Sequence, residues 1–338
     1  MAKNNLSVLY IVTVLICWVC CSYFGCEWTP DRDNPLDPQS DVYTPPNKAS
    51  VLVMVRNISG SSPLSGVTVT LLPSGRMGLT GFNGNHLFEG VEDGEHWVKV
   101  WKQDYVMDST QVTTVVGIID TASFKLNAVP LFDSVSVTSH HIGHHEVSHD
   151  TLISFYAIIT DPDGQLPSVS VMFDGTVLGN LEYDQTEDAF TNSFPQEEYP
   201  THSIYDMIRR PFVLIADDQA NGVNTSNPYY VVRFLDNLPV FSSPTYEHVF
   251  TEHWPTLVWY TYSTELTYVQ NVRVFDNDDV LWWDSLSIGQ EITQVTVTDS
   301  LPESNGLENP DWYYCTLEIV DIVSNTARSE EIKFFIFP

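Results

Sequence analysis

The sequence has too few cysteines beyond its first residues to form a disulfide framework. Four of the five cysteines lie within the first 26 residues, namely Cys17, Cys20, Cys21 and Cys26. If the thiol of Cys26 is modified, Cys315 has no partner, so stability must come from apolar burial. Cys315 shares one face of an alternating segment with Tyr313 and Leu317. That pattern predicts a small core residue rather than a catalytic thiol.

Positive charge is scarce. The chain carries 14 Lys and Arg against 44 Asp and Glu, a formal charge of −30. Such a surface repels nucleic acid, so the composition excludes a nucleic-acid partner. The 43% of hydrophobic residues nevertheless suffices to build cores. We expect the acidic residues to form a solvated surface; a divalent cation held by some of them stays open as the alternative, and no other cofactor is expected.

The sequence also lacks the motifs of common enzymes. It contains no Gly-x-Ser-x-Gly elbow, no phosphate-binding Walker loop and no helix that carries a His-Glu-x-x-His motif. Long segments with a helical period of 3.6 are missing as well, and 205–210 has room for only one or two helical turns. We therefore expect a protein without α-helical domains that is not an enzyme.

The N-terminus has the features of an export signal. Lys3 is the only charge before an apolar run from Leu6 to Cys21, and Gly25 precedes Cys26. This order predicts a signal peptide over 1–25 and a Pro- and Asp-rich tether over 26–48. Residues 23–26 (YFGC) resemble a bacterial lipobox, which implies lipidation of Cys26. The alternative is an uncleaved anchor, because 6–24 is about long enough to cross a ~30 Å hydrocarbon core. Either reading places the chain outside the cytoplasm, attached to a membrane.

After the tether, short β-rich runs, 229–234 among them, alternate with clusters of Gly, Pro, Asn and Asp. Several runs alternate apolar and polar residues with a period of two, which is typical of half-buried antiparallel strands. Regularly spaced strands of this kind favour β-sandwiches, and the length allows about three. We expect an all-β chain of three consecutive β-sandwich domains, over 49–128, 129–240 and 241–338.

Each of the three expected domains resembles a known family. Residues 65–71 (SGVTVTL), 80–91 (TGFNGNHLFEGV) and 94–100 (GEHWVKV) resemble the carboxypeptidase-regulatory-like domain, a prealbumin-like sandwich grouped with carbohydrate-binding-like folds. Residues 152–164 (LISFYAIITDPDG) resemble a strand and turn of bacterial immunoglobulin-like domains. Trp259 and Tyr313 lie where a fibronectin type III or immunoglobulin-like domain has its core Trp and its corner Tyr. With the tether, the resemblance is to a Bacteroidetes-type surface lipoprotein.

Half of the ten histidines lie within ten positions. They are His140, His141, His144, His145 and His149. Imidazole with nearby carboxylates suits Zn²⁺, Cu²⁺ or Ni²⁺, so these residues are weak candidates for a metal site. The competing interpretation is a solvated polar loop between two strands, and we favour the loop.

Exposed aromatic rings are the natural platform for sugars. Trp282 and Trp283 are adjacent, so on one strand they point to opposite faces, and at least one is a weak candidate for ligand binding. Packing between domains is the alternative.

Together these features lead us to expect a non-catalytic, membrane-anchored envelope lipoprotein, most simply in the outer membrane. It would act as a stalk, an adaptor or a surface-interaction protein. Its expected partners are the membrane, through the lipid, and a glycan or an envelope protein. The alternative function is a carbohydrate-binding surface module that uses exposed aromatics.

Overall fold

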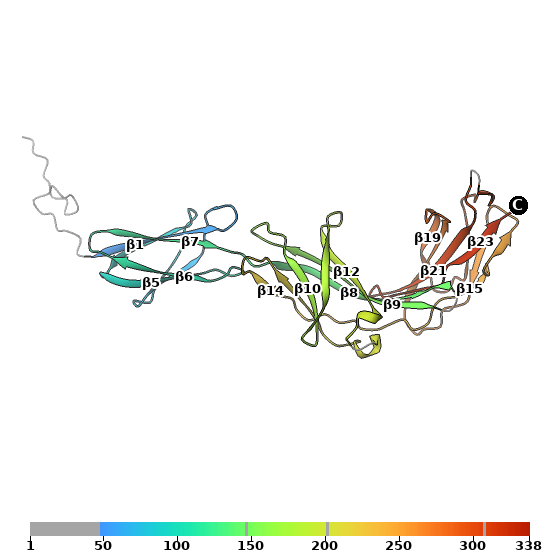
Figure 1. Ribbon diagram of the computed structural model, residues 1–338, viewed down its shortest axis with the longest axis horizontal. Coiled ribbons are helices and arrows are strands. Elements are labelled where there is room, and N and C mark those ends of the chain that lie inside the picture. Colours follow the sequence, from blue (N-terminus) through green and yellow to red (C-terminus); the bar gives the residue numbers. More distant parts are fainter. Residues whose placement is uncertain (1–47, 146–147, 201–202, 307–308) are drawn as a thin grey trace, which may run out of the picture.

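The computed structural model describes residues 48–145, 148–200, 203–306 and 309–338. Cys26 and the apolar run before it lie outside these residues. The described chain is an elongated row of strand-rich units (Figure 1). We call residues 48–128 module 1, 129–240 module 2 and 241–338 module 3. The chain is all-β with several sandwich sheets, as the sequence predicts.

Module 1 packs a three-stranded sheet on a four-stranded one. Its strands are β1 (Ala49–Asn57), β2 (Thr68–Leu72), β3 (Arg76–Leu79), β4 (Asn85–Val91), β5 (Gly94–Trp101), β6 (Asp108–Thr114) and β7 (Ile119–Leu126). The sheet orders are β4-β1-β7 and β3-β2-β5-β6, and β1 pairs with β7 in parallel. Strict alternation along β1 buries Val51, Val53 and Val55 completely, opposite Val98 and Val100 of β5 in one core.

Module 2 begins with a long hairpin. Its elements are β8 (Leu131–Gly143), β9 (His149–Thr160), β10 (Ser168–Phe173), β11 (Thr176–Asp184), β12 (Ala189–Pro195), two single-turn 3₁₀-helices (Gln196–Glu198 and Ile204–Asp206), β13 (Phe212–Asp217) and β14 (Val223–Thr225). Its core is rich in aromatic rings, with Phe155 edge-on to both Phe194 and Phe212. The short turn at 204–206 agrees with the sequence expectation.

Module 3 contains nine strands. They are β15 (Phe241–Ser243), β16 (His248–Phe250), β17 (Thr256–Trp259), β18 (Tyr268–Asp276), β19 (Leu281–Gly289), β20 (Gln294–Thr296), β21 (Tyr313–Asp321), β22 (Thr326–Arg328) and β23 (Ile332–Ile336). Trp259 and Cys315 are core residues, as predicted. Complete burial raises the pKa of the Cys315 thiol, which keeps it protonated and unreactive. The Tyr313 hydroxyl donates to the Pro302 carbonyl at 3.2 Å, as a corner tyrosine would.

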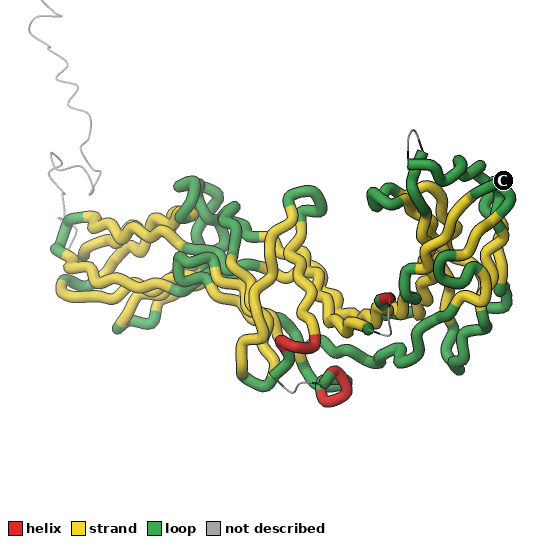
Figure 2. Tube along the Cα trace, turned by 45° about the vertical axis from the view of Figure 1, so that its right-hand side comes forward, coloured by secondary structure: helices red, strands yellow, loops and turns green. Residues whose placement is uncertain are grey.

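Modules 2 and 3 share one hydrogen-bonded sheet. Strand β22 pairs antiparallel with β21 and in parallel with the far end of β8, so 13 strands form a continuous sheet across the boundary. In Figure 2 the two strands of the β8–β9 hairpin, drawn in yellow, extend from module 2 to module 3. Among the described residues there is no α-helix, and no helix has the length and apolarity needed to span a membrane.

Two sequence expectations about local structure are wrong. The histidine-rich segment is not a loop, because most of it belongs to β8 and β9, whose pairing extends to Gly143 opposite His149. The apolar run 229–234 is not a strand, although its composition favours one. Instead Val231 is fully buried, and its carbonyl accepts from Arg209 N.

Candidate functional site

Buried carboxylates of module 2 hold the end of module 1. Asp163 accepts a hydrogen bond from the Asn57 amide and another from Ala128 N at 2.6 Å. Asp218 accepts from the Asn127 amide at 2.6 Å. Asp163 and Asp218 are almost fully buried. Each of these bonds pairs a buried carboxylate of module 2 with a donor from module 1. The contact is therefore a polar clasp between modules 1 and 2.

Asp161 gives this clasp an unfavourable charge. Its Oδ1 accepts from Asp163 N, but its Oδ2 is buried without a hydrogen-bond partner. Burial raises the pKa of the Asp161 carboxyl, and the negative charges of Asp163 and Asp218 raise it further. Three carboxylates therefore meet at this junction with amide donors rather than cationic side chains between them.

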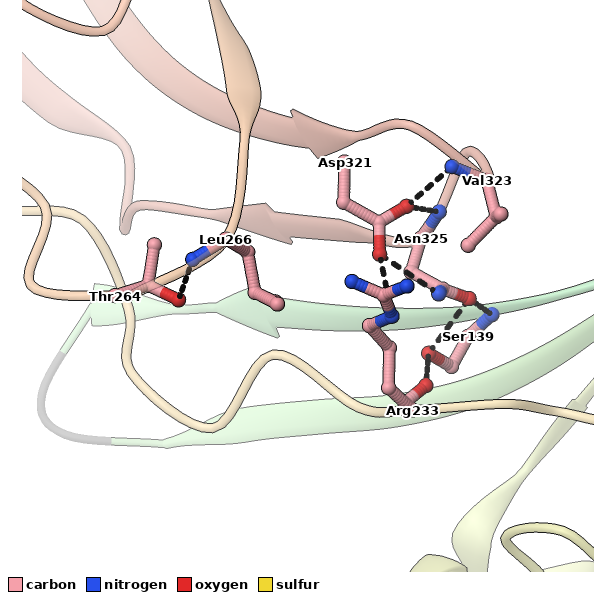
Figure 3. Close-up of polar contacts among 7 residues, drawn as sticks. All are labelled: Ser139, Arg233, Thr264, Leu266, Asp321, Val323 and Asn325. Carbon is pink, nitrogen blue, oxygen red and sulfur yellow. Dashed lines mark hydrogen bonds and ion pairs between the residues drawn. The ribbon is translucent and has the colours of Figure 1, made fainter.

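The junction between modules 2 and 3 has a buried hydrogen-bond network (Figure 3). The Asn325 side-chain oxygen accepts from Ser139 N at 3.0 Å and from the Ser139 hydroxyl at 3.1 Å. The Asn325 amide donates to Asp321 at 3.0 Å, and Arg233 Nε lies 3.4 Å from the same carboxylate. Ser139 and Asn325 are 0% and 1% exposed. Each member satisfies another, so the network holds β8 against the β21–β22 turn.

The histidines belong to this second junction. His140 shares hydrogen bonds with Thr326 of module 3 at 2.8 Å and with Thr138 at 2.9 Å. His141 Nδ1 lies 3.0 Å from the Leu235 carbonyl, while its Nε2 is buried without a partner. Burial lowers the pKa of both imidazoles. Both rings are therefore held neutral, His140 against Thr326 of module 3 and His141 against Leu235 within module 2.

The remaining histidines of the cluster make separate contacts. His145 stacks on Tyr246 of module 3 with 3.9 Å between ring centroids, and His144 pairs with Asp150 at 2.8 Å. His149 lies edge-on to His141. Across the described residues, no three His, Cys, Asp or Glu side chains are arranged to hold a metal ion. The five predicted metal ligands are thus distributed along a packed hairpin.

The two tryptophans chosen from the sequence are largely covered. Trp283 is a core residue whose Nε1 donates to the Thr298 hydroxyl at 3.0 Å, so neither ring face is free. Trp282 is half-buried on the other face of β19 and donates to Asp276 at 2.8 Å. It lines a polar cleft of about 370 Å³ with Asp276 and Asp278. The alternation predicted their opposite directions, but not the contacts that cover them.

An exposed apolar face lies on module 1 instead. Trp97 and Trp101 point outward from β5 and are 47% and 54% exposed. Thr68 of β2 lies between Trp101 of β5 and Leu79 of β3. Met77 of β3 pairs with Thr70, two residues farther along β2. The sequence signal for this face is the alternation in β5, since burial of Val98 and Val100 forces both tryptophans to the opposite side.

Comparison with protein-family models and with curated proteins finds no match. Among solved structures, the chain is similar to the FN1–FN3 domains of chicken CNTN1, with a TM-score of 0.31, 8% identity, and coverage of 87% of this chain and 100% of that one. It is also similar to BcpA, the major pilin subunit of Bacillus cereus (TM-score 0.28, 11% identity, 81% and 87% coverage). A DUF3823 family protein from Bacteroides ovatus has a TM-score of 0.24 and 12% identity, with 55% and 100% coverage. Similarities this weak support no functional conclusion.

Proposed function

We propose that the chain is an exported, non-catalytic protein that is anchored in the outer membrane by lipid on Cys26 and acts as a stalk or adaptor. The observation that carries the proposal is the continuous sheet through modules 2 and 3. Backbone hydrogen bonds between β8 and β22 fix the direction of one module relative to the next, which independent modules on a flexible linker would lack.

The clasp between modules 1 and 2 supports the same function. Asn57 and Asn127, at opposite ends of the module 1 sequence, both donate to carboxylates of module 2. A stalk needs its units to keep a line, and two polar contacts from separate parts of module 1 restrict bending between modules 1 and 2. The signal-like segment before Lys48 supplies export and attachment.

The anchor is tested by the intact mass of the chain extracted from membranes. We expect an N-terminus at Cys26 with added acyl chains, because two or three chains hold a protein on a membrane essentially permanently. Cys26→Ser should leave uncleaved precursor or release soluble protein, whereas the control Cys315→Ser should change neither location nor processing. An unmodified N-terminus at Met1 would instead indicate a transmembrane anchor.

The exposed face of module 1 favours a second candidate function, binding of a glycan. Trp97 and Trp101 lie four residues apart on one strand, roughly 13 Å along it, and Lys99 lies between them. Flat rings so arranged offer apolar platforms for successive sugar units. A glycan array with a fragment starting at Glu27 tests this: a hit lost in Trp97→Ala and Trp101→Ala, but kept in Trp254→Ala of module 3, supports binding. No reproducible hit removes this candidate.

A further inference from the structure

The turn between β6 and β7 exposes a run of aliphatic side chains. Val115, Val116, Ile118 and Ile119 are 51%, 44%, 51% and 61% exposed. Gly117 between them has a φ of +81°, which suits a tight reversal. The strands on either side alternate normally, so the turn is a departure from the pattern of module 1. Single exposed aliphatics need no explanation, but a contiguous run of them marks a surface that contacts something apolar.

This turn lies at the point where the chain enters module 1. Gly117 N donates to the Lys48 carbonyl at 3.2 Å, and Ser50 N donates to the Ile118 carbonyl at 3.0 Å. From the turn, β7 runs the length of the module towards Asn127 and the clasp with module 2. Figure 1 shows the same arrangement, with the chain entering at the end of module 1 opposite module 2. The aliphatic turn therefore forms the free end of the row of modules.

The sequence before Lys48 brings this end close to a membrane. The apolar run 6–21 and Cys26 precede it, and the 22 residues from Cys26 to Asn47 reach at most about 75 Å when fully extended. An anchor at Cys26 therefore limits how far module 1 can lie from the bilayer. Modules 2 and 3 follow module 1 on the side away from Lys48 (Figure 2).

The distribution of charge favours an end-on contact. Residues 48–128 carry six Lys or Arg and seven Asp or Glu. Residues 129–338 carry six Lys or Arg and 32 Asp or Glu. Only module 1 can thus approach an anionic surface without strong repulsion. With module 1 standing on its free end, modules 2 and 3 lie farther from the membrane surface than the ~8 Å over which salt screens their charge. Near the turn Lys48 pairs with Glu92, which offsets part of the acidic charge there.

We propose that the turn Val115–Ile119 inserts into the headgroup and acyl boundary of a phospholipid bilayer and holds module 1 upright on the membrane. This inference rests on the proposed membrane anchoring and adds a second, direct contact to it. Insertion of a few aliphatic side chains is weak alone, but a tether makes it effective by keeping the turn at the surface.

A fragment from Glu27 with an N-terminal His tag, held on vesicles that contain phosphatidylethanolamine, phosphatidylglycerol and a nickel-chelating lipid, supplies the tether without acylation. Because Cys315 is buried, a cysteine added at the surface is the reactive one. An environment-sensitive dye on Ile118→Cys should show a blue-shifted emission on the vesicles, and the same dye on Val280→Cys of module 3 should not. Val280 is similarly exposed.

Two further variants of the labelled Ile118→Cys protein complete the test. Val116→Asp should abolish the blue shift, because a charge cannot enter the acyl boundary, while Val177→Asp of module 2 should leave it unchanged. An unshifted emission at Ile118→Cys, or an equal shift at Val280→Cys, overturns the insertion proposal. If the extracted chain carries lipid but the dye does not shift, only the insertion fails. If the dye shifts but Cys26 is unmodified, only the lipid anchor fails.

Discussion

The two junctions of this molecule do the same mechanical task with different chemistry. Modules 1 and 2 meet through side chains, in which Asn57 and Asn127 donate to the buried carboxylates Asp163 and Asp218. Modules 2 and 3 meet through backbone pairing of β8 with β22, with the Ser139–Asn325 network beside it. A shared sheet distributes the contact over many backbone groups, whereas the clasp depends on a few side chains. We therefore expect the first junction to open more easily than the second.

The largest expected effect tests the second junction. Asn325→Ala leaves the buried Ser139 N–H without an acceptor. It also removes one of the two acceptors of the Ser139 hydroxyl and one donor to the Asp321 carboxylate. We expect a loss of about 2–3 kcal/mol from the unfolding transition of modules 2 and 3, measured by calorimetry. The control Asn192→Ala removes an exposed hydrogen bond to the Asn180 carbonyl and should cost less than about 0.5 kcal/mol. Equal losses in the two variants would contradict a role for the network.

Loss of the Asp163 carboxylate should loosen the first junction. Asp163→Ala removes the acceptor of Asn57 and of Ala128 N, so we expect about 1–3 kcal/mol less free energy for closing the clasp. The cores of modules 1 and 2 are separate, so their own unfolding should change little. The measurement is the small-angle scattering profile, which should show a wider range of shapes. Asp174→Ala, which loses a half-exposed pair with Arg210, should leave the profile unchanged.

Acidification should weaken the second junction. The folded-state pKa values of His140 and His141 are lowered by burial, so near pH 6.5 and below the unfolded chain binds protons that the folded chain does not. Stability is then full above about pH 6.5 and falls as the pH drops through that value. The double variant His140→Gln, His141→Gln should flatten this slope in thermal unfolding from pH 7.5 to 5.5. A slope that is the same in both proteins would exclude the two histidines as its source.

Acidification should strengthen the first junction, and this is the smallest of the expected effects. The pKa of Asp161 is raised, so its contribution to stability is present at low pH and is lost as the pH rises through the raised value. Asp161→Asn should therefore stabilise the clasp at pH 7, and the gain should shrink towards pH 4, near the ordinary value for Asp. Comparing scattering profiles of the two proteins at both pH values measures it. A clasp looser at pH 7 in Asp161→Asn would show that the carboxylate is needed there.

Much of the fold follows from local alternation. The runs that contain Val53, Val69, Val98 and Val171 form strands with the valines inside, because a period of two places alternate residues on one face. The core positions of Trp259 and Cys315 follow from the same rule.

What could not be predicted depends on residues distant in the chain. His140 and His141 have the composition of a solvated loop, and only contacts 94 or more residues later hold them in the fold: Thr326 of module 3 for His140, and the Leu235 carbonyl of module 2 for His141. The clasp is similar: Asp163 and Asp218 look like ordinary turn residues until module 1 is placed against them. Strand β22 has three residues, too few for a sequence signal, yet it joins the sheet across two modules.

The central claim, that the modules keep a fixed line, is tested most directly by distances between spin labels on the fragment from Glu27. One pair, Met77→Cys with Val177→Cys, spans the first junction, and the pair Val177→Cys with Val280→Cys spans the second. All three positions are exposed, and Cys315 is buried. We predict one narrow distance distribution for each pair, with the first alone broadened by Asp163→Ala. Broad distributions for both pairs in the otherwise unchanged protein would show modules that move independently and would contradict the stalk.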